Sequence, residues 1–324
     1  MDIAVKMIGV GGPDQLTVAP DEPKTPGPTE IRIRHEAIGV NYIDIYHRSG
    51  LYPLGPLPAV LGVEGAGVIE AVGSGVTALR VGQRVAYAGA PVGAYASTRL
   101  LPAVRAIGLP DDVSASAAAS SLVRGITAHM LLTKTFPVGA GNVILVHAAA
   151  GGLGTMLARW AKALGASVIG TVSTPEKAEF AKLNGVDHVI VGRDVDLARE
   201  VADVTDGRGV DVAYDGIGGT TLLKTLACVR PFGTVASIGQ AGGPIAPISV
   251  EELGPRRSLS LARPSVMAYS ADPSLYRSAA KAVLEAMRSG LSATIGETYP
   301  LAEAARAQAE LEAGATTGSS LLIP

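Results

Sequence analysis

Residues 142–154 read NVILVHAAAGGLG, a short apolar run that leads directly into a glycine-rich turn. The first six residues have the length and the β-branched content of a strand buried in a parallel sheet. Three residues fill the positions of a G-x-G-x-x-G fingerprint, with alanine at the first position: Ala149, Gly151 and Gly154. The helix predicted at 152–164 would direct its N-terminal N–H groups at a pyrophosphate. Together with a strand predicted at 167–172, the segment forms a βαβ unit and predicts a dinucleotide site.

The residues after the second strand indicate which dinucleotide the site prefers. NAD-binding units usually place a carboxylate about 20 residues past the glycines, where it binds the ribose 2′-hydroxyl. No Asp or Glu occurs between Thr155 and Pro175, whereas Ser173 and Lys177 offer a hydroxyl and an ammonium group that could bind a 2′-phosphate. The same stretch is also a good helix start, with Lys177 as a solvated surface charge. Both interpretations can hold together. Because the carboxylate is absent and Lys177 is present, we predict NADPH as the cofactor.

Length, composition and charge limit the class of protein. A chain of 324 residues is long for one hydrophobic core, so we expect two domains. Hydrophobic residues make up 48% of the chain and charged residues 17%, which suits a buried parallel sheet. The net charge of −2 gives no electrostatic footprint for nucleic acid, although Arg256 and Arg257 form a small basic pair. With no long apolar run, no signal-peptide pattern and one cysteine, Cys228, we expect a cytoplasmic protein.

Two patterns divide the chain. Residues 1–122 read as short strands separated by glycine and proline, which is typical of a compact, mainly β domain. From 123 to 263, strands alternate with helices. The six strands expected there are 142–148, 167–172, 187–191, 210–215, 233–238 and 258–263. This alternation predicts a doubly wound sheet that binds ligands at the carboxyl ends of its strands.

The C-terminal part is expected to return to the first domain. Residues 274–290 and 301–313 read as amphipathic helices, and 319–323 reads as a final strand. The dinucleotide-binding domain, residues 123–263, would then be an insertion into a catalytic domain made of residues 1–122 and 264–324.

A set of motifs extends over nearly the whole length of the chain. They are NYIDIY at 41–46, RSGLYP at 48–53, GVEGAG at 62–67, VGQRV at 81–85, AAAGG at 148–152, RPS at 263–265 and GSSLL at 318–322. Through them the chain closely resembles quinone oxidoreductases of the zeta-crystallin type, zinc-independent members of the medium-chain dehydrogenase/reductase superfamily. The resemblance implies an α/β protein in which a Rossmann doubly wound parallel sheet is inserted into a mainly β, GroES-like catalytic domain. It also implies a homodimer that pairs through the edge strand near 258–263.

Zinc alcohol dehydrogenases of the same superfamily depend on residues that this chain lacks. They place a cysteine where it has Asn41 and a His-Glu pair where it has Val63 and Glu64, and they carry a four-cysteine zinc lobe. A catalytic zinc needs about three protein ligands, and Glu64 with the scattered histidines is not a credible set. We therefore expect no metal.

The resemblance further implies which residues form the active site. Asn41 and Tyr46 would lie beside the nicotinamide, with Asp44 and Tyr52 near them. Asn41 and Tyr46 could donate hydrogen bonds to a developing oxyanion; alternatively, Asn41 could cap a turn, Tyr46 could be a packed helix aromatic, and Arg263 could form a salt bridge. The expected cofactor contacts are Asn41, Tyr46, Thr127, Met130, Ala149, Gly151, Gly152, Leu153, Gly154, Ser173, Lys177, Gly192, Ile217, Ile238, Gly239, Gln240 and Arg263.

Two positions depart from the family pattern. Bacterial relatives commonly have a tyrosine where this chain has Gly192 and a C-terminal arginine where it has Gly314, and both family residues help to enclose the 2′-phosphate. Arg193 could compensate for their loss. We therefore expect a preference for NADPH, through Lys177 and Ser173, that is less sharp than in those relatives.

The leading functional hypothesis is NADPH-dependent reduction of a quinone without a metal, because quinones are strong electrophiles that need little activation. A rival reaction is reduction of the activated C=C bond of an enone or 2-alkenal, which needs a proton donor such as Tyr46 or Tyr52. A rival from another class is a non-enzymatic protein that binds NADPH or RNA, although the charge of −2 disfavours RNA. The expected partners are a small-molecule acceptor and a second copy of the chain, without nucleic acid or membrane.

Overall fold

The structure, a computed structural model, describes residues 1–255 and 257–324. Arg256, one half of the basic pair noted above, lies outside the described residues. The chain divides into two compact units, one formed by Met1–Ile126 with Val266–Pro324 and the other by Thr127–Ser265. Helix α2, Ala115–Met130, includes the first point of division and continues into a turn of π-helix, Leu131–Thr135.

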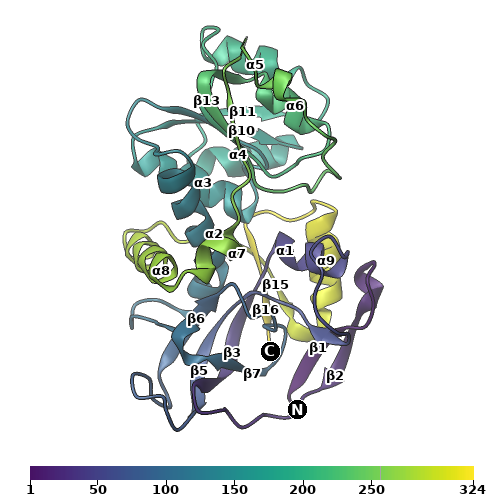
Figure 1. The fold of residues 1–324 in the computed structure, drawn as a ribbon, viewed down its shortest axis with the longest axis vertical. Coiled ribbons are helices and arrows are strands. Elements are labelled where there is room, and N and C mark those ends of the chain that lie inside the picture. The colour runs from purple at the N-terminus through teal and green to yellow at the C-terminus, as the bar shows by residue number, and fades with distance from the viewer. Residues whose placement is uncertain (256) are drawn as a thin grey trace. The chain divides into compact units, whose positions relative to one another are not determined.

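The second unit is built on a six-stranded parallel sheet in the order β11-β10-β9-β12-β13-β14. Three of these strands, β10, β11 and β13, are labelled in Figure 1. Its strands are β9 Val143–Val146, β10 Ser167–Val172, β11 His188–Val191, β12 Val210–Asp215, β13 Val229–Ser237 and β14 Ser260–Ala262. The strand order reverses between β9 and β12, which makes the carboxyl ends of these two strands the switch point where such sheets bind ligands. The predicted doubly wound sheet and its six strands are confirmed.

Four helices connect these strands, and local sequence explains where they begin. They are α3 Gly152–Ala163, α4 Pro175–Leu183, α5 Leu197–Val204 and α6 Thr221–Leu226. The Asp196 carboxylate caps α5 by accepting a hydrogen bond from the Arg199 N–H at 3.2 Å. A 3₁₀ turn, Val250–Glu252, precedes β14. The core of this unit includes Leu145, Ile169, Val210, Leu226 and Val235, all buried.

The first unit contains two sheets. One is seven-stranded, in the order β15-β16-β3-β5-β6-β8 with β7 paired to β3, and the other has the order β2-β1-β4. The strands are β1 Ile3–Met7, β2 Leu16–Pro20, β3 Glu30–Val40, β4 Ala59–Val60, β5 Glu64–Val72, β6 Arg84–Ala88, β7 Thr98–Pro102, β8 Ile107–Gly108, β15 Ile295–Pro300 and β16 Ser319–Ile323. All pairs are antiparallel except β15 with β16. This is the mainly β, GroES-like domain that the sequence predicts.

Helices complete the first unit. They are α1 Tyr42–Arg48, α7 Val266–Ala271, α8 Pro273–Arg288 and α9 Ala304–Glu312, with 3₁₀ turns at Pro13–Gln15, Ala103–Arg105 and Leu301–Glu303. The C-terminal strand β16 pairs with β3, where Leu321 lies opposite Gly39, so the predicted return of the chain to this unit is confirmed. No helix within the two described ranges has the length and apolar character needed to cross a membrane.

Candidate functional site

Close backbone approaches shape the glycine-rich turn between β9 and α3. Gly151 is the N-cap of α3, and its N–H donates to the Ala148 carbonyl at 2.9 Å. A Cβ on Gly154 would lie 2.3 Å from the same carbonyl oxygen, so this position requires glycine. Ala149, which replaces the first glycine, is fully buried, and its Cβ would be 2.7 Å from a Cβ on Gly170 of β10. A glycine on the neighbouring strand therefore makes room for the alanine.

The start of α3 fits the pyrophosphate of a dinucleotide. The helix has 12 residues, and no side chain caps its first turn. The N–H groups of Gly152, Leu153 and Gly154 belong to the first helical turn, which has no partners within the helix. Together with the positive end of the helix dipole, they form the arrangement that binds phosphate groups.

Two positive charges approach each other after β10 and β11. Lys177 is half-buried in the first turn of α4; burial lowers the pKa of its ammonium group, and the charge of Arg193 lowers it further. An anion bound between two nearby positive charges is stabilised by both of them. Ser173 is partly exposed at the same strand end. Thr174 is the N-cap of α4, accepting from the Lys177 N–H at 3.4 Å, so the helix-start interpretation of this stretch is confirmed.

Both departures from the family pattern occur where the backbone favours glycine. Gly192 has a φ of +115°, and its N–H donates to the Val172 carbonyl at 2.9 Å. Gly314 has a φ of +66° and follows α9, where its N–H donates to the Leu311 carbonyl at 3.1 Å. Any side chain would be strained at either position.

The loops after β12 and β13 are joined by backbone hydrogen bonds. The Ile238 N–H donates to the Asp215 carbonyl at 2.7 Å, and the Gly242 N–H donates to the Ile217 carbonyl at 2.7 Å. A Cβ on Gly218 would lie 2.7 Å from Cα of Gln240, which shows how closely the loops approach. Four predicted cofactor residues are thus brought to one edge of the sheet: Ile217, Ile238, Gly239 and Gln240.

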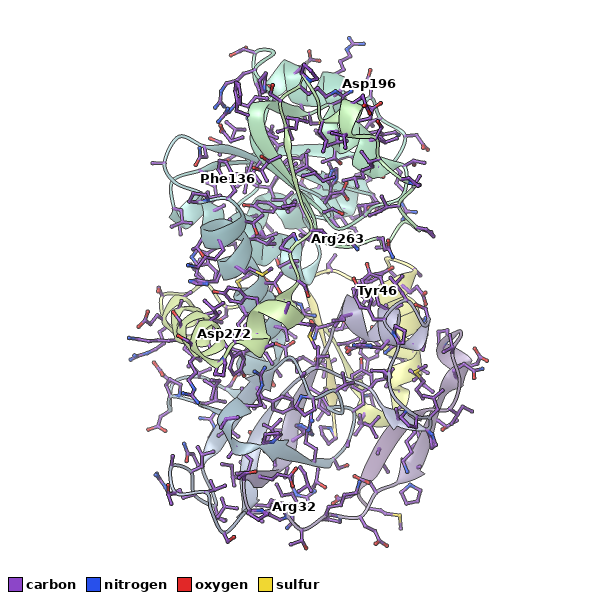
Figure 2. All side chains as sticks on the ribbon, viewed as in Figure 1. Arg32, Tyr46, Phe136, Asp196, Arg263 and Asp272 are labelled. Carbon is purple, nitrogen blue, oxygen red and sulfur yellow. The ribbon has the colours of Figure 1, made fainter. Side chains whose placement is uncertain are left out.

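Arg263 follows β14 (Figure 2) and donates to Ser237 Oγ at 2.7 Å. Arg263, Ser237 and Gln240 supply polar groups to a cavity of about 350 Å³. The other lining residues are apolar: Leu222, Ile245, Ala246, Ile248 and Leu261. Thr127 and Met130 lie instead on α2, where Met130 is buried and Thr127 is partly exposed.

In the first unit, Asn41 is the N-cap of α1 and is 5% exposed. Its Nδ2 donates to Glu64 Oε2 at 2.9 Å and, more weakly, to the Gly39 carbonyl at 3.4 Å. Both amide hydrogens therefore face acceptors, which fixes the orientation of the amide. Asn41 therefore caps the start of α1, as the alternative interpretation expects. Before its amide could donate to an oxyanion, its hydrogen bonds to Glu64 and Gly39 would have to break.

Asp44, in the first turn of α1, is fully buried. Its Oδ2 accepts from the Asn41 N–H at 2.8 Å and from the Tyr95 hydroxyl at 3.0 Å. Its Oδ1 has no partner among the residues that the structure describes. Burial raises the pKa of this carboxyl group to about 7; the two hydrogen bonds oppose the shift, and the charge of Glu64 adds to it. The first unit thus holds a carboxyl group that titrates near neutral pH.

Tyr46 lies on α1 (Figure 2), and its ring contacts two other tyrosines edge to face. The ring centroids are 5.2 Å from Tyr42 and 5.3 Å from Tyr52. Tyr46 is 9% exposed and Tyr52 is 37% exposed. Burial raises the pKa of Tyr42 to about 12, which makes it a poor proton donor. The structure brings Tyr46 and Tyr52 together as a partly exposed aromatic pair.

Sequence reasoning missed the ion pair that supports Asn41. Glu64 Oε2 lies 3.3 Å from the Arg124 guanidinium, and Glu64 Oε1 accepts from the Val123 N–H at 2.6 Å. Both charged side chains are buried, and burial raises the pKa of Glu64 against the opposing charge of Arg124. The sequence does carry a signal for this pair, because Glu64 and Arg124 are each a charged residue within an otherwise apolar segment.

Two family models match the chain, one within the first unit and one mainly over the second. A model described as "Alcohol dehydrogenase GroES-like domain" matches residues 27–111, and one described as "Zinc-binding dehydrogenase" matches residues 152–285. A GroES-like domain joined to a doubly wound dinucleotide fold defines the medium-chain dehydrogenases and reductases. No three His, Cys, Asp or Glu side chains in the described part of the chain are grouped so that they could hold a metal ion.

Named relatives match over nearly the full length. A quinone oxidoreductase of Pseudomonas aeruginosa is 42% identical, with 99% of each chain covered. A 2-haloacrylate reductase of Burkholderia is 44% identical, covering 97% of this chain and 96% of the relative. The crystal structure of Escherichia coli quinone oxidoreductase complexed with NADPH has a TM-score of 0.96 at 39% identity, covering 99% of this chain and 100% of that one. The chain belongs to the quinone oxidoreductase family.

Proposed function

We propose that the protein is an NADPH-dependent quinone reductase that works without a metal. The observation that carries the proposal is its 42% identity to a quinone oxidoreductase over 99% of both chains. A structure with the same fold, at a TM-score of 0.96, is that of a quinone oxidoreductase in complex with NADPH. The residues of this chain must then fit the cofactor and an acceptor.

The second unit has a group suited to each part of NADPH. The first turn of α3 would bind the pyrophosphate. Lys177 and Arg193 would bind the 2′-phosphate, with Ser173 as a further donor. The loops that carry Ile217, Gly239 and Gln240 would support the nicotinamide half. When bound, the cofactor supplies a hydride from C4 of the nicotinamide.

The first unit has groups suited to a flat, electron-poor acceptor. Tyr46 and Tyr52 offer an aromatic pair that is partly open to solvent. The side-chain oxygen of Asn41 could accept a hydrogen bond from a hydroxyl of the hydroquinone product, since its amide hydrogens face Glu64 and Gly39. In the overall reaction a quinone, NADPH and one proton become a hydroquinone and NADP⁺. Because burial raises the pKa of Asp44 to about 7, its carboxyl group keeps a proton up to about neutral pH.

A second candidate function is reduction of an activated C=C bond. The Burkholderia relative, at 44% identity, is a 2-haloacrylate reductase. This reaction delivers a proton to the carbon α to the carbonyl, so it needs a proton donor near the acceptor. Tyr46 and Tyr52 remain the predicted donors for it.

An acceptor panel tests the proposal. Purified protein is mixed with NADPH and, in turn, with a benzoquinone, a naphthoquinone, 2-chloroacrylate and a 2-alkenal, and loss of the reduced nicotinamide absorbance is followed. We expect turnover with the quinones. Turnover of only the C=C substrates would overturn the quinone proposal, and NADPH binding without any turnover would favour a binding protein.

The expected homodimer also belongs to this proposal. β14 ends the six-stranded sheet, and Leu261 on it is 36% exposed. An exposed edge strand needs a partner or a cover, and a second copy of β14 would supply one across a two-fold axis. The cytoplasmic location stays a prediction.

A further inference from the structure

A run of hydrogen bonds crosses the carboxyl ends of β10, β9 and β12. His147, which follows β9, places Nδ1 2.9 Å from Thr171 Oγ1 of β10 and Nε2 2.9 Å from Thr225 Oγ1 of α6. Thr225 Oγ1 lies 2.8 Å from Asp215 Oδ2 at the end of β12. His147, Thr225 and Asp215 are all buried. The run therefore lies at the switch point of the sheet.

The chemistry of these groups fixes the direction of the bonds. The single hydroxyl hydrogen of Thr225 is directed at an acceptor, either the Asp215 carboxylate or the Thr221 carbonyl at 3.0 Å. The hydroxyl oxygen must then accept the hydrogen on Nε2 of His147. Burial lowers the pKa of His147 against the opposing charge of Asp215, which favours the neutral ring. Its unprotonated Nδ1 accepts from the Thr171 hydroxyl.

The two ends of this run hold different loops. Asp215 Oδ1 accepts from the Ile217 N–H at 2.8 Å and the Gly218 N–H at 2.9 Å, which fixes the loop after β12. That loop is bonded to the loop after β13 through Ile217 and Gly242. Near the other end, His147 is bonded to Thr171 of β10 and directly precedes the turn of Ala148 to Gly151. The run thus connects the turn suited to pyrophosphate with the loops suited to nicotinamide.

We propose that His147, Thr225 and Asp215 are positioning residues for the dinucleotide, which set the separation of the glycine-rich turn from the loops after β12 and β13. The inference rests on the proposed function, because it assumes that one cofactor extends across both loops. Affinity for the whole cofactor then depends on these residues, whereas affinity for its adenosine end does not. A purely structural role would instead lower stability without separating the two affinities.

The test is the Thr225→Val variant, which keeps the shape of the side chain and leaves His147 Nε2 and Asp215 Oδ2 without their partner. The Kd of NADPH is measured by fluorescence titration, and the Kd of adenosine 2′,5′-bisphosphate by calorimetry. We expect the Kd of NADPH to rise about tenfold or more, by analogy with the loss seen in metal sites when residues that orient the metal's ligands are removed. The Kd of the bisphosphate should stay close to that of wild type, because this ligand does not extend to the loops after β12 and β13. Thr234→Val on β13 is the matched control, since Thr234 is similarly buried, and its affinities should not change.

Thr225→Ser restores the hydroxyl and should restore the Kd of NADPH, which provides a test even if Thr225→Val fails to fold. Asp215→Asn gives a second route, because it keeps an acceptor and weakens the bonds to Ile217 and Gly218. Equal loss of affinity for both ligands, or none for either, would overturn the inference. A wild-type protein that does not bind NADPH would refute the proposed function and this inference with it, and that result is visible before any variant is made.

Discussion

Replacing Asp44 by asparagine should stabilise the first unit at alkaline pH. The carboxyl group is fully buried, and Oδ2 accepts hydrogen bonds from the Asn41 N–H and the Tyr95 hydroxyl. Two buried carboxyl groups, Asp44 and Glu64, interact with the charge of one buried guanidinium, Arg124. An asparagine can accept the same two bonds, and its NH₂ group takes the place of a protonated Oδ1. The substitution therefore mimics the protonated acid and removes its titration.

The magnitude follows from the raised pKa. The pKa of Asp44 rises from 3.8, the ordinary value that also applies to the unfolded chain, to about 7 in the folded protein. The folded protein favours the protonated carboxyl group, and this contributes to its stability. The contribution is fully present below the pKa of Asp44 in the unfolded chain, 3.8, and is lost as the pH rises through its pKa in the folded protein, about 7. Each pH unit between these values corresponds to about 1.4 kcal/mol. From about pH 5 to about pH 8, wild type should lose roughly 2.5 kcal/mol of stability relative to Asp44→Asn.

The assay must follow the unit that contains Asp44. Eight of the nine tyrosines lie in the first unit, whereas Tyr214 and the single tryptophan, Trp160, lie in the second. Near-ultraviolet circular dichroism of tyrosine during urea unfolding therefore reports mainly on the first unit. Asp111→Asn, at an exposed aspartate of the same unit, is the control and should show no such change with pH. A difference between Asp44→Asn and wild type that is the same at both pH values would refute the reasoning.

Lys177→Ala and Arg193→Ala should each lower the ratio of kcat/KM for NADPH to that for NADH about tenfold or more, because each removes a charge-assisted bond worth roughly 1.5–3 kcal/mol. Gly154→Ala should abolish NADPH binding in a calorimetric titration, since its Cβ would lie 2.3 Å from the Ala148 carbonyl oxygen. Leu261→Lys should convert the proposed dimer to a monomer in light scattering, because it places two like charges across the paired edge strands.

Each of these variants has a matched control. Lys182→Ala, in the same helix as Lys177 but exposed, should leave the cofactor ratio unchanged. Gly139→Ala, where an added Cβ meets nothing within 4 Å, should leave NADPH binding intact. Leu223→Lys, at a leucine of the same unit that is 48% exposed, should not affect the dimer. An unchanged ratio in both cation variants, tight NADPH binding by Gly154→Ala, or a dimeric Leu261→Lys would contradict the respective proposal.

The second unit could be predicted because its signals are local. The glycine-rich turn lies within a few residues of its strand and helix, and the start of α4 is given by Thr174 and Pro175. β12 is buried along its whole length, so it reads as a strand without alternation. The interactions around Asn41 have no such signal, because Glu64 lies 23 residues from Asn41 and 60 from Arg124. The raised pKa of Asp44 was equally hidden, since the third residue of a helix often holds an exposed acidic side chain.

The glycine at position 192 and the charge beside it have a common explanation. With a φ of +115°, Gly192 turns the chain after β11, and the next residue, Arg193, comes close enough to Lys177 for its charge to lower the pKa of the ammonium group. A tyrosine at this position would have to adopt a strained backbone, so this turn excludes the aromatic wall that the family pattern places here. We therefore expect positive charge, rather than an enclosing wall, to select the 2′-phosphate. A site that attracts the phosphate but does not enclose it should still admit NADH, which has no 2′-phosphate and loses only that attraction, so we expect a cofactor preference that is present but not sharp.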